Sequence, residues 1–233
     1  MKLENAKVLV TGGSAGIGLA TARMLRDHGA QVAICGRRGD VVTAAAKEIG
    51  ALPLTGDVGN EDDARRLVAE TIREFGEFDT LINNAGWGRF AKLDDLRVED
   101  FLAVLETNVI GAMLMARESA RHFVKRGGGN IVNVSSTAGS RGFAGGTAYV
   151  ASKFALGGMT QCWRAELRQH DIRVMQVNPS EVQTDFAAAG GRVQKLSERK
   201  LRSEDIAHAI CGMLAMEDRG FTTELTVFAT NPD

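Results

Sequence analysis

The sequence predicts an α/β fold in which a doubly wound parallel sheet carries helices on both faces. Three observations lead to this prediction. Short apolar, β-branched runs recur along the 233 residues and are separated by longer segments of helical periodicity. The runs are apolar almost throughout, as expected for strands that are buried on both faces. Glycine is frequent, with 27 residues, whereas there are only three prolines, so the glycines do not form linkers. Strands and helices that alternate this often indicate a parallel sheet.

Seven runs are expected to form strands, because each is short, apolar and bounded by turn residues or a helical segment. In chain order they are residues 7–11, 31–35, 51–55, 79–83, 130–135, 172–178 and 224–230.

Four helices can be delimited from their apolar faces and end signals. Residues 17–28 carry an apolar face and stop at Gly29, and residues 61–75 open with acidic residues and stop at Gly76. Residues 99–125 form the longest expected helix, and a second long helix is expected over residues 149–169. No linker, composition break or repeat divides the chain, so we expect one domain over residues 1–233.

The composition excludes several classes of protein. With 44% hydrophobic and 24% charged residues, the chain is neither disordered nor a coiled coil. Its 28 Lys and Arg residues balance 29 Asp and Glu residues, so no overall field favours nucleic acid or an anionic membrane. Cys35, Cys162 and Cys211 lie far apart and form no metal or redox motif. Because no signal-peptide pattern and no stretch of roughly 18 apolar residues occurs, we expect a cytoplasmic protein that needs no metal.

The first expected strand leads directly into a glycine-rich turn, TGGSAGIG at residues 11–18, and then into a helix. Gly12, Gly16 and Gly18 would let the backbone turn tightly, admit a pyrophosphate close to the main chain and let helix and strand pack closely. The start of the helix offers free N–H groups and a positive dipole end to phosphates. Such turns also join strands to helices without binding a ligand. The place of this one, after the first strand of an alternating pattern, favours a dinucleotide-binding, Rossmann-like fold.

The spacing Gly-x-x-x-Gly-x-Gly and the motifs that follow it resemble the short-chain dehydrogenase/reductase family over nearly the whole chain. The further motifs are Asp57-Val58, NNAG at residues 83–86, Asn108 within NVIG, Ser136 after the fifth strand and Tyr149-x-x-x-Lys153. The resemblance implies about seven strands in the order 3-2-1-4-5-6-7. The chain is similar in particular to the one-domain 3-oxoacyl-[acyl-carrier-protein] reductases.

The resemblance also implies which residues bind a nicotinamide dinucleotide. They are Gly12, Ser14, Ala15, Gly16, Ile17, Gly18, Arg37, Arg38, Asp57, Val58, Asn84, Ala85, Gly86, Tyr149, Lys153, Pro179, Val182 and Thr184. Relatives that use NAD usually carry Asp where this chain has Gly36, and Arg37 and Arg38 follow. Because a guanidinium can bind a 2′-phosphate through two hydrogen bonds, we expect NADP(H) rather than NAD(H). A pair of solvated loop arginines is the alternative interpretation.

Tyr149 and Lys153 are the candidate reacting pair, since Lys153 follows the only tyrosine by one helical turn on the same face. An ammonium there is expected to lower the pKa of the phenol, which is about 10 unperturbed, and so to create a proton donor for carbonyl reduction. A chance pair on an exposed helix turn is the alternative. The resemblance implies that Ser136 positions the substrate oxygen, Tyr149 is the acid/base and Lys153 also orients the nicotinamide ribose. It further implies that Asn108 holds a water that relays protons to Lys153. Strand alternation turns the neighbouring Ser135 to the opposite side.

After the sixth expected strand, NPSEVQT at residues 178–184 is similar to the family pattern N-P-G-x-V-x-T. Ser180 replaces the glycine, which calls the local backbone geometry into question. Val182 and Thr184 are carried over as contacts of the nicotinamide carboxamide. The end of the chain also departs from the family, because ELTVFATNPD lacks the glycine pair that commonly closes the last strand.

Two features bear on the substrate. Residues 185–202 carry five basic residues, Arg192 and Lys195 among them, against two acidic ones. This segment is either a basic lid that favours an anionic substrate or an acidic carrier protein, or a solvated helix face. Trp87, Phe90 and Phe143 either line an apolar substrate pocket or pack in the core. The first hypothesis is a reductase of a 3-oxoacyl thioester. The alternatives are another ketone, sugar or alcohol as substrate, or an NADP(H)-sensing binding protein without turnover.

Relatives usually form dimers or tetramers through the pair of long helices, so the resemblance implies a homodimer or homotetramer. In this chain the two helices carry large side chains that serve either subunit contacts or packing on the sheet, namely Met113, Met115, Phe154, Met159 and Trp163.

Overall fold

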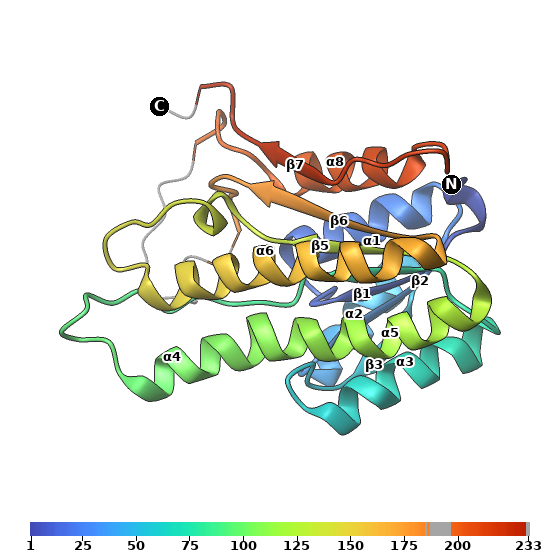
Figure 1. Ribbon diagram of the computed structural model, residues 1–233, viewed down its shortest axis with the longest axis horizontal. Coiled ribbons are helices and arrows are strands. Elements are labelled where there is room, and N and C mark those ends of the chain that lie inside the picture. Colours follow the sequence, from blue (N-terminus) through green and yellow to red (C-terminus); the bar gives the residue numbers. More distant parts are fainter. Residues whose placement is uncertain (185, 187–196, 232–233) are drawn as a thin grey trace.

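Seven parallel strands form one sheet in the computed structural model, which describes residues 1–184, 186 and 197–231 (Figure 1). In chain order they are β1 (Lys7–Thr11), β2 (Gln31–Gly36), β3 (Leu52–Thr55), β4 (Thr80–Asn83), β5 (Gly129–Val134), β6 (Ile172–Pro179) and β7 (Glu224–Val227). Their order across the sheet is β3-β2-β1-β4-β5-β6-β7, which confirms the expected topology. Such sheets bind ligands beyond the carboxyl ends of the strands where the order reverses, here between β1 and β4.

Successive residues of the central strands pack on opposite faces of the sheet. In β1, Val8 and Val10 join the hydrophobic cluster on one face and Leu9 joins the cluster on the other, and all three are fully buried. This two-sided burial explains why the strands are apolar almost throughout. Strand β3 contains Pro53, which the sheet tolerates because β3 lies at its edge.

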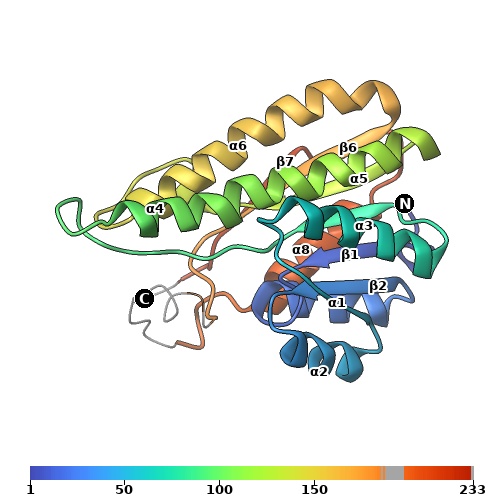
Figure 2. The same ribbon diagram turned by 90° about the horizontal axis from the view of Figure 1, so that it is seen from below.

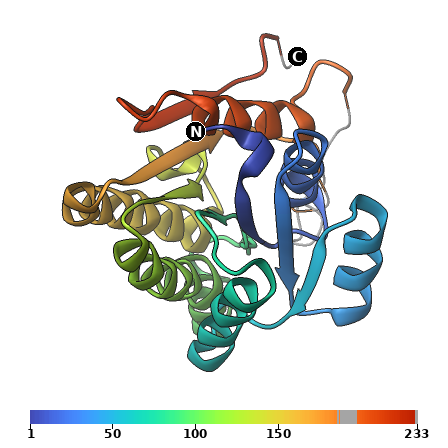
Figure 3. The ribbon, with the colours of Figure 1, turned by 90° about the vertical axis from the view of Figure 1, so that its right-hand side faces the viewer.

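Helices cover both faces of the sheet (Figure 3). One face carries α1 (Gly16–Asp27), α2 (Gly39–Ile49) and α8 (Ser203–Ala215), and the other carries α3 (Glu61–Phe75), α5 (Ala112–Arg126) and α6 (Thr147–Leu167). Short 3₁₀ turns are η1 (Leu3–Asn5), η3 (Thr137–Gly139) and η4 (Arg168–His170). None of the helices in the described part of the chain combines the length and the apolar character that crossing a bilayer requires.

The longest expected helix, residues 99–125, is interrupted by a π-helical turn. Helix α4 (Val98–Leu105) leads into the turn η2 (Glu106–Gly111), and α5 continues along the same line beside α6 (Figure 2). The expectation of one regular helix is therefore wrong over these six residues, because the apolar periodicity on either side does not reveal the extra residue of a π-turn. Such turns occur frequently at functional sites, and this one contains Asn108.

The large side chains of the two long helices divide between the sheet and the surface. Met115 is fully buried, and Met113 and Trp163 pack partly buried against the same cluster. Phe154, by contrast, is 48% exposed on α6. Packing on the sheet thus accounts for the first three side chains, and the homodimer or homotetramer stays a prediction.

The guanidinium of Arg173 joins β6 to the end of α8. It is 7% exposed and donates hydrogen bonds to Asn130 Oδ1 at 2.7 Å and to the carbonyls of Leu214 and Met216 at 3.2 Å each. Carbonyls at the end of a helix have no partner within the helix. Arg173 therefore shares these two carbonyls with the N-terminal ammonium of Met1, which donates to Leu214 at 3.2 Å and to Met216 at 2.6 Å, and it is the charged donor of Asn130 Oδ1.

We expect Arg173→Met to lower the free energy of unfolding by about 1–3 kcal/mol, because Asn130 Oδ1 loses its charged donor and the two carbonyls at the end of α8 keep only the N-terminal ammonium. Urea unfolding at neutral pH measures this. The matched control is Arg168→Met, because the Arg168 side chain is exposed and forms no hydrogen bond or ion pair within the described residues. The control should change the unfolding free energy by less than about 0.5 kcal/mol. Equal effects of the two substitutions would contradict the role given to Arg173.

Candidate active site

The turn between β1 and α1 requires glycine at three positions. Gly12 and Gly16 have φ values of +62° and +54°, which residues other than glycine rarely adopt. At Gly18 a Cβ would lie 2.3 Å from the carbonyl oxygen of Gly12, closer than any real contact allows. The structure thus brings the three predicted glycines together in one tight strand-to-helix turn.

Asn84 holds this turn from the neighbouring strand. Its Nδ2 donates to the carbonyls of Thr11 at 2.9 Å and Gly12 at 3.1 Å. The hydroxyl oxygen of Thr11 in turn accepts from the N–H groups of Asn84 and Ala85. The side-chain amide of Asn84 is therefore committed to the protein's own main chain. Asn84 thus supports the glycine turn, and its contact with a cofactor stays a prediction.

The start of α1 offers main-chain N–H groups of the kind that bind the phosphates of a dinucleotide. No side chain among the described residues caps the start of α1 after Ala15, so the first N–H groups of the helix stay available. A Cβ at Gly16 would point toward Thr184, 3.4 Å from its Cγ2. Thr184, from the segment after β6, therefore lies opposite the glycine turn, as the motif spacing predicts.

Arg37 and Arg38 lie at the carboxyl end of β2, where NADP binders hold the 2′-phosphate. Both side chains are exposed, and neither guanidinium forms a hydrogen bond or ion pair with another described residue. Ser14 lies next to them, with its Oγ 3.7 Å from the position of a Cβ at Gly36. Two free guanidinium groups and a hydroxyl fit a phosphate group at this place.

Asp57 and Val58 are engaged within their own loop. The Asp57 N–H donates to Asp63 Oδ2 at 2.8 Å, and its carboxylate accepts from the N–H of Gly59 at 3.0 Å. Val58 is 6% exposed and packs against Gly111 of the π-turn. These side chains shape the loop at the carboxyl end of β3.

Ser136, Tyr149 and Lys153 meet at the carboxyl end of β5. Ser136 begins the turn η3, where its Oγ accepts from the N–H of Ala138 and also forms a hydrogen bond with Tyr149. Lys153, 5% exposed, lies 5.7 Å from the centre of the Tyr149 ring. Ser135 is turned away, and its buried Oγ has no hydrogen-bond partner among the described residues. The structure therefore joins Ser136, and not Ser135, to the tyrosine.

Burial controls the protonation of this group. It raises the pKa of Tyr149 to about 12, and the hydrogen bond with Ser136 opposes that effect more weakly. It lowers the pKa of Lys153 to about 8. The expectation that the pKa of Tyr149 lies below its usual value is therefore wrong. Desolvation of the phenol dominates, and the Lys153 ammonium donates instead to the carbonyl of Val134 at 2.9 Å.

Asn108 connects the loop after β4 to α6. Its Oδ1 accepts from the N–H of Trp87 at 3.0 Å, and its Nδ2 donates to the Trp87 carbonyl at 2.9 Å and to Ser152 Oγ at 3.0 Å. Ser152 Oγ donates to the Tyr149 carbonyl at 2.7 Å. Both amide protons of Asn108 are thus used to position the loop and α6, and its role in holding a water that relays protons to Lys153 stays a prediction. Sequence reasoning missed Ser152, although its place directly before Lys153 was the available signal.

The serine that replaces the family glycine after β6 causes no strain. Among the described residues, Asp171 is the non-glycine residue with a positive φ, so Ser180 has an ordinary backbone. Its N–H donates to the carbonyl of Val227 in β7 at 2.9 Å. The preceding Pro179 is buried, and its carbonyl lies 3.5 Å from Ser136 Oγ. The question that the sequence raised about this position is therefore answered by a regular strand pairing.

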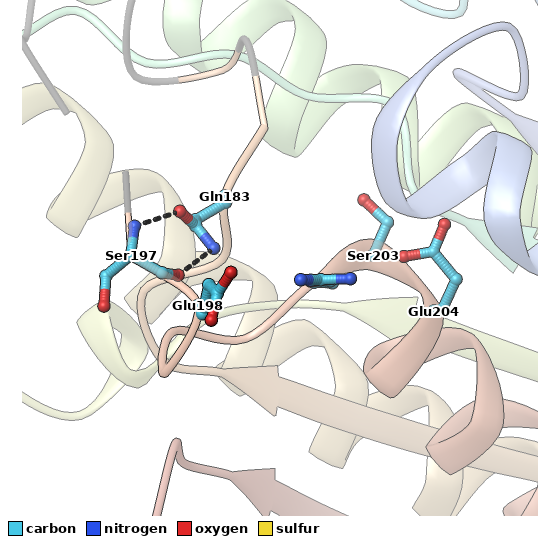
Figure 4. A pocket seen from close by; sticks show the side chains of 6 residues that line it. Gln183, Ser197, Glu198, Ser203 and Glu204 are labelled. Atoms are coloured by element: carbon cyan, nitrogen blue, oxygen red, sulfur yellow. Dashed lines mark hydrogen bonds between the residues drawn. The ribbon is translucent and has the colours of Figure 1, made fainter. Parts of the chain in front are cut away.

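The side chain of Gln183 binds the main chain of Ser197. Its Nε2 donates to the Ser197 carbonyl and its Oε1 accepts from the Ser197 N–H, both at 2.7 Å (Figure 4). The Gln183 N–H also donates to the carbonyl of Leu201, next to a bridge between Val182 and Leu201. Sequence reasoning missed these two hydrogen bonds between Gln183 and Ser197, here called the Gln183 clasp, because they join residues that are 14 positions apart.

Of the basic segment, residues 185–202, the structure describes residues 186 and 197–202. Arg192 and Lys195 lie outside the described residues. Lys200 pairs with Glu181 at 3.1 Å, and the N–H of Arg202 is bound by Asp205 at the start of α8. Lys200 is thus already neutralised by the protein.

A family model described as short chain dehydrogenase matches residues 6–194, a span that contains the glycine turn and the Ser136, Tyr149 and Lys153 group. The chain belongs to the short-chain dehydrogenase family. Structural similarity agrees with this assignment. A short-chain dehydrogenase from Burkholderia cenocepacia in complex with NADP has a TM-score of 0.87 and 31% identity, with 98% of each chain covered.

Several relatives of this short-chain dehydrogenase carry different names. Glucose 1-dehydrogenase of Gluconobacter oxydans is 36% identical over 97% of this chain and 91% of its own length. The 3-oxoacyl-[acyl-carrier-protein] reductase FabG of Thermotoga maritima is 35% identical over 79% of this chain and 77% of its own length. The uncharacterized oxidoreductase YxnA of Bacillus subtilis is 36% identical over 79% of this chain, and the match spans 54% of that protein.

We expect Gly18→Ala to destabilise this dehydrogenase by about 1–3 kcal/mol, because the new methyl group overlaps the Gly12 carbonyl and forces the turn apart. The matched control is Gly212→Ala in α8, where a Cβ would meet nothing within 4 Å. That substitution should stabilise the protein by about 0.5–1 kcal/mol, because alanine favours the helix. Urea unfolding of both variants measures the difference. Two variants that are equally stable would contradict the steric requirement at Gly18.

Proposed function

We propose that this short-chain dehydrogenase transfers a hydride between NADP(H) and a carbonyl or secondary alcohol substrate. The observation that carries the proposal is the contact of Tyr149 with Ser136 and Lys153 at the carboxyl edge of the sheet, on the side of the glycine turn. A hydroxyl beside a buried ammonium is what protonation of a carbonyl oxygen requires. The NADP complex of the B. cenocepacia relative supports the choice of cofactor.

The residues that would bind the cofactor are those of the glycine turn, the start of α1 and the end of β2. The N–H groups at the start of α1 bind the pyrophosphate, and Gly12, Gly16 and Gly18 let it approach the main chain. Arg37 and Arg38 bind the 2′-phosphate, whose two negative charges account for the preference over NAD(H). When bound, NADPH supplies the hydride that reduces the carbonyl carbon.

In the proposed reduction, Ser136 Oγ donates a hydrogen bond to the substrate carbonyl oxygen and holds it beside Tyr149. The hydroxyl of Tyr149 gives its proton to that oxygen as the carbon receives the hydride, so the ketone becomes an alcohol and NADPH becomes NADP⁺. Because burial raises the pKa of Tyr149, the phenol is protonated before the reaction. The nearby Lys153 charge then stabilises the phenolate that remains. The ammonium protons that do not bind Val134 are free for the nicotinamide ribose.

A 3-oxoacyl thioester is one candidate substrate, because FabG of T. maritima is similar to this chain. A sugar is a second candidate, because glucose 1-dehydrogenase of G. oxydans is similar to an equal degree. An NADP(H)-sensing protein without turnover is the alternative from another class. The intact Ser136, Tyr149 and Lys153 group favours an enzyme, because binding alone needs no proton donor. A cytoplasmic location and a homodimer or homotetramer remain part of the proposal.

Tyr149→Phe should abolish reduction of every carbonyl substrate while it leaves the dissociation constant of NADPH within about threefold of the wild type. The reason is that the phenol contributes the proton, and general acid groups typically accelerate reactions about 10²–10⁴-fold. NADPH oxidation at 340 nm measures turnover, and fluorescence titration measures cofactor binding. Turnover that survives in the variant would contradict the proposal. Wild type that binds NADPH tightly but reduces no carbonyl would support the sensing protein instead.

The value of kcat/KM for reduction should decline as the pH rises through about 8. Burial lowers the pKa of Lys153 from its usual 10.5 to about 8, so the ammonium is present below this pH and is lost above it. The pKa of Tyr149, about 12, keeps the phenol protonated over the same range. Rates measured from about pH 6 to 10 with saturating NADPH give the profile, because kcat/KM for the carbonyl reports the pKa values of the site before that substrate binds. A flat profile up to about pH 9.5 would contradict this role of Lys153.

A further inference from the structure

Three phenylalanine rings gather around Tyr149 from segments that follow three different strands. The Phe90 and Phe186 rings lie 5.8 Å and 5.3 Å from the Tyr149 ring, between centroids, and both are steeply tilted against it. The Phe143 ring lies 6.0 Å from that of Phe90. Phe90 follows β4, Phe143 follows β5 and Phe186 follows β6, so the carboxyl edge of the sheet brings them together.

The main chain is built to admit these rings. A Cβ at Gly88 would lie 2.9 Å from the Phe90 ring and 3.3 Å from the Phe186 ring. A Cβ at Gly146 would lie 2.7 Å from the Phe143 ring. The two loops are joined where the N–H of Ala91 donates to the carbonyl of Gly145 at 3.0 Å. The rings therefore pack against bare backbone, and larger residues at either glycine would displace them.

Solvent still reaches this group of rings. Phe143 is 42% exposed, and Phe90 and Phe186 are partly exposed, so none of the three is a buried core residue. Tyr149 is likewise partly exposed, although its hydroxyl is desolvated. The charge beside Phe90 is already neutralised, because Arg89 pairs with Asp100 at 3.3 Å. The rings thus form an apolar, accessible wall at the proton donor.

The main chain just before Phe186 is held by Gln183 and Thr184. Gln183 binds both main-chain groups of Ser197. The N–H of Phe186 also lies 3.4 Å from Thr184 Oγ1. The ring that contacts Tyr149 thus starts from a fixed point two residues beyond the glycine-facing Thr184.

We propose that the ketone reduced at Tyr149 carries a flat aromatic group, which lies against Phe90, Phe143 and Phe186. This inference rests on the proposed function and names its substrate class. Aromatic rings attract one another in tilted and offset arrangements beyond the effect of buried area. A sugar at the same place would lose hydrogen bonds of its hydroxyls to water and gain none from phenylalanine. A saturated ring would fill the space but lack the ring-to-ring attraction.

The test compares kcat/KM with NADPH for acetophenone, cyclohexyl methyl ketone, 2-butanone and an acetoacetyl thioester, together with oxidation of D-glucose by NADP⁺. Acetophenone and cyclohexyl methyl ketone differ chiefly in the flatness of the ring. We expect acetophenone to exceed both of the other ketones and the thioester by about tenfold or more, and glucose to be a poor substrate.

Ring-removing variants identify the residues responsible. In Phe186→Ala and Phe90→Ala, the ratio of kcat/KM for acetophenone to that for 2-butanone should fall about tenfold, mainly through KM for acetophenone. Phe186→Tyr keeps a ring and should restore the ratio. The matched control is Val124→Ala, because Val124 is 39% exposed and lies in the last turn of α5, which leads into the start of β5 at the opposite edge of the sheet. It should leave the ratio unchanged.

The outcomes separate this inference from the proposed function. Turnover in which glucose, the thioester or the saturated ketone matches acetophenone overturns the aromatic substrate but keeps the reductase. Equal losses for acetophenone and 2-butanone in the ring variants also overturn it, since the rings would then serve only to place Tyr149. No turnover of any compound by wild type that binds NADPH overturns the proposed function, and the inference with it.

Discussion

The hydrogen bonds of the loop after β4 connect the glycine turn to the helix that carries the proton donor. At one end of the loop, Asn84 binds main-chain carbonyls of the turn. At the other end, Asn108 binds both main-chain groups of Trp87 and reaches Ser152, which binds the Tyr149 carbonyl. Each buried donor or acceptor left without a partner would cost about 1–3 kcal/mol. Because these hydrogen bonds join the glycine turn, the loop after β4 and α6, they place the cofactor side and the reacting side of the site together.

Burial at the carboxyl edge of the sheet then shifts the pKa values of Tyr149 and Lys153 in opposite directions. It favours the neutral form of each, so the pKa of Tyr149 rises and that of Lys153 falls. In the proposed reaction both effects serve reduction at neutral pH, since the phenol is protonated and the ammonium is still charged. The sheet edge supplies this environment because β5 and α6 enclose the Lys153 ammonium beneath the Val134 carbonyl.

The substrate side depends on contacts between loops rather than on the strands. Gln183 fixes the segment after β6 through Ser197, and the loop after β4 is tied to the loop after β5 between Ala91 and Gly145. These links place the aromatic rings beside Tyr149. The same fold with other loop residues would present a different wall, which agrees with the variety of names among the relatives.

The sequence by itself determined the alternation of strands and helices, the glycine turn and the motif residues, because these depend on local periodicity and short spacing. Periodicity therefore predicted a parallel sheet, and the resemblance of the motifs to the short-chain dehydrogenase/reductase family implied the strand order and the residues that meet at Ser136. Tertiary structure alone decided the π-turn at Asn108, the Gln183 clasp, the regular backbone at Ser180 and the raised pKa of Tyr149. Each of these arises from contacts between residues distant in the chain or from the degree of burial. Neither the contacts nor the burial can be inferred from the order of neighbouring residues, because both depend on the folded arrangement.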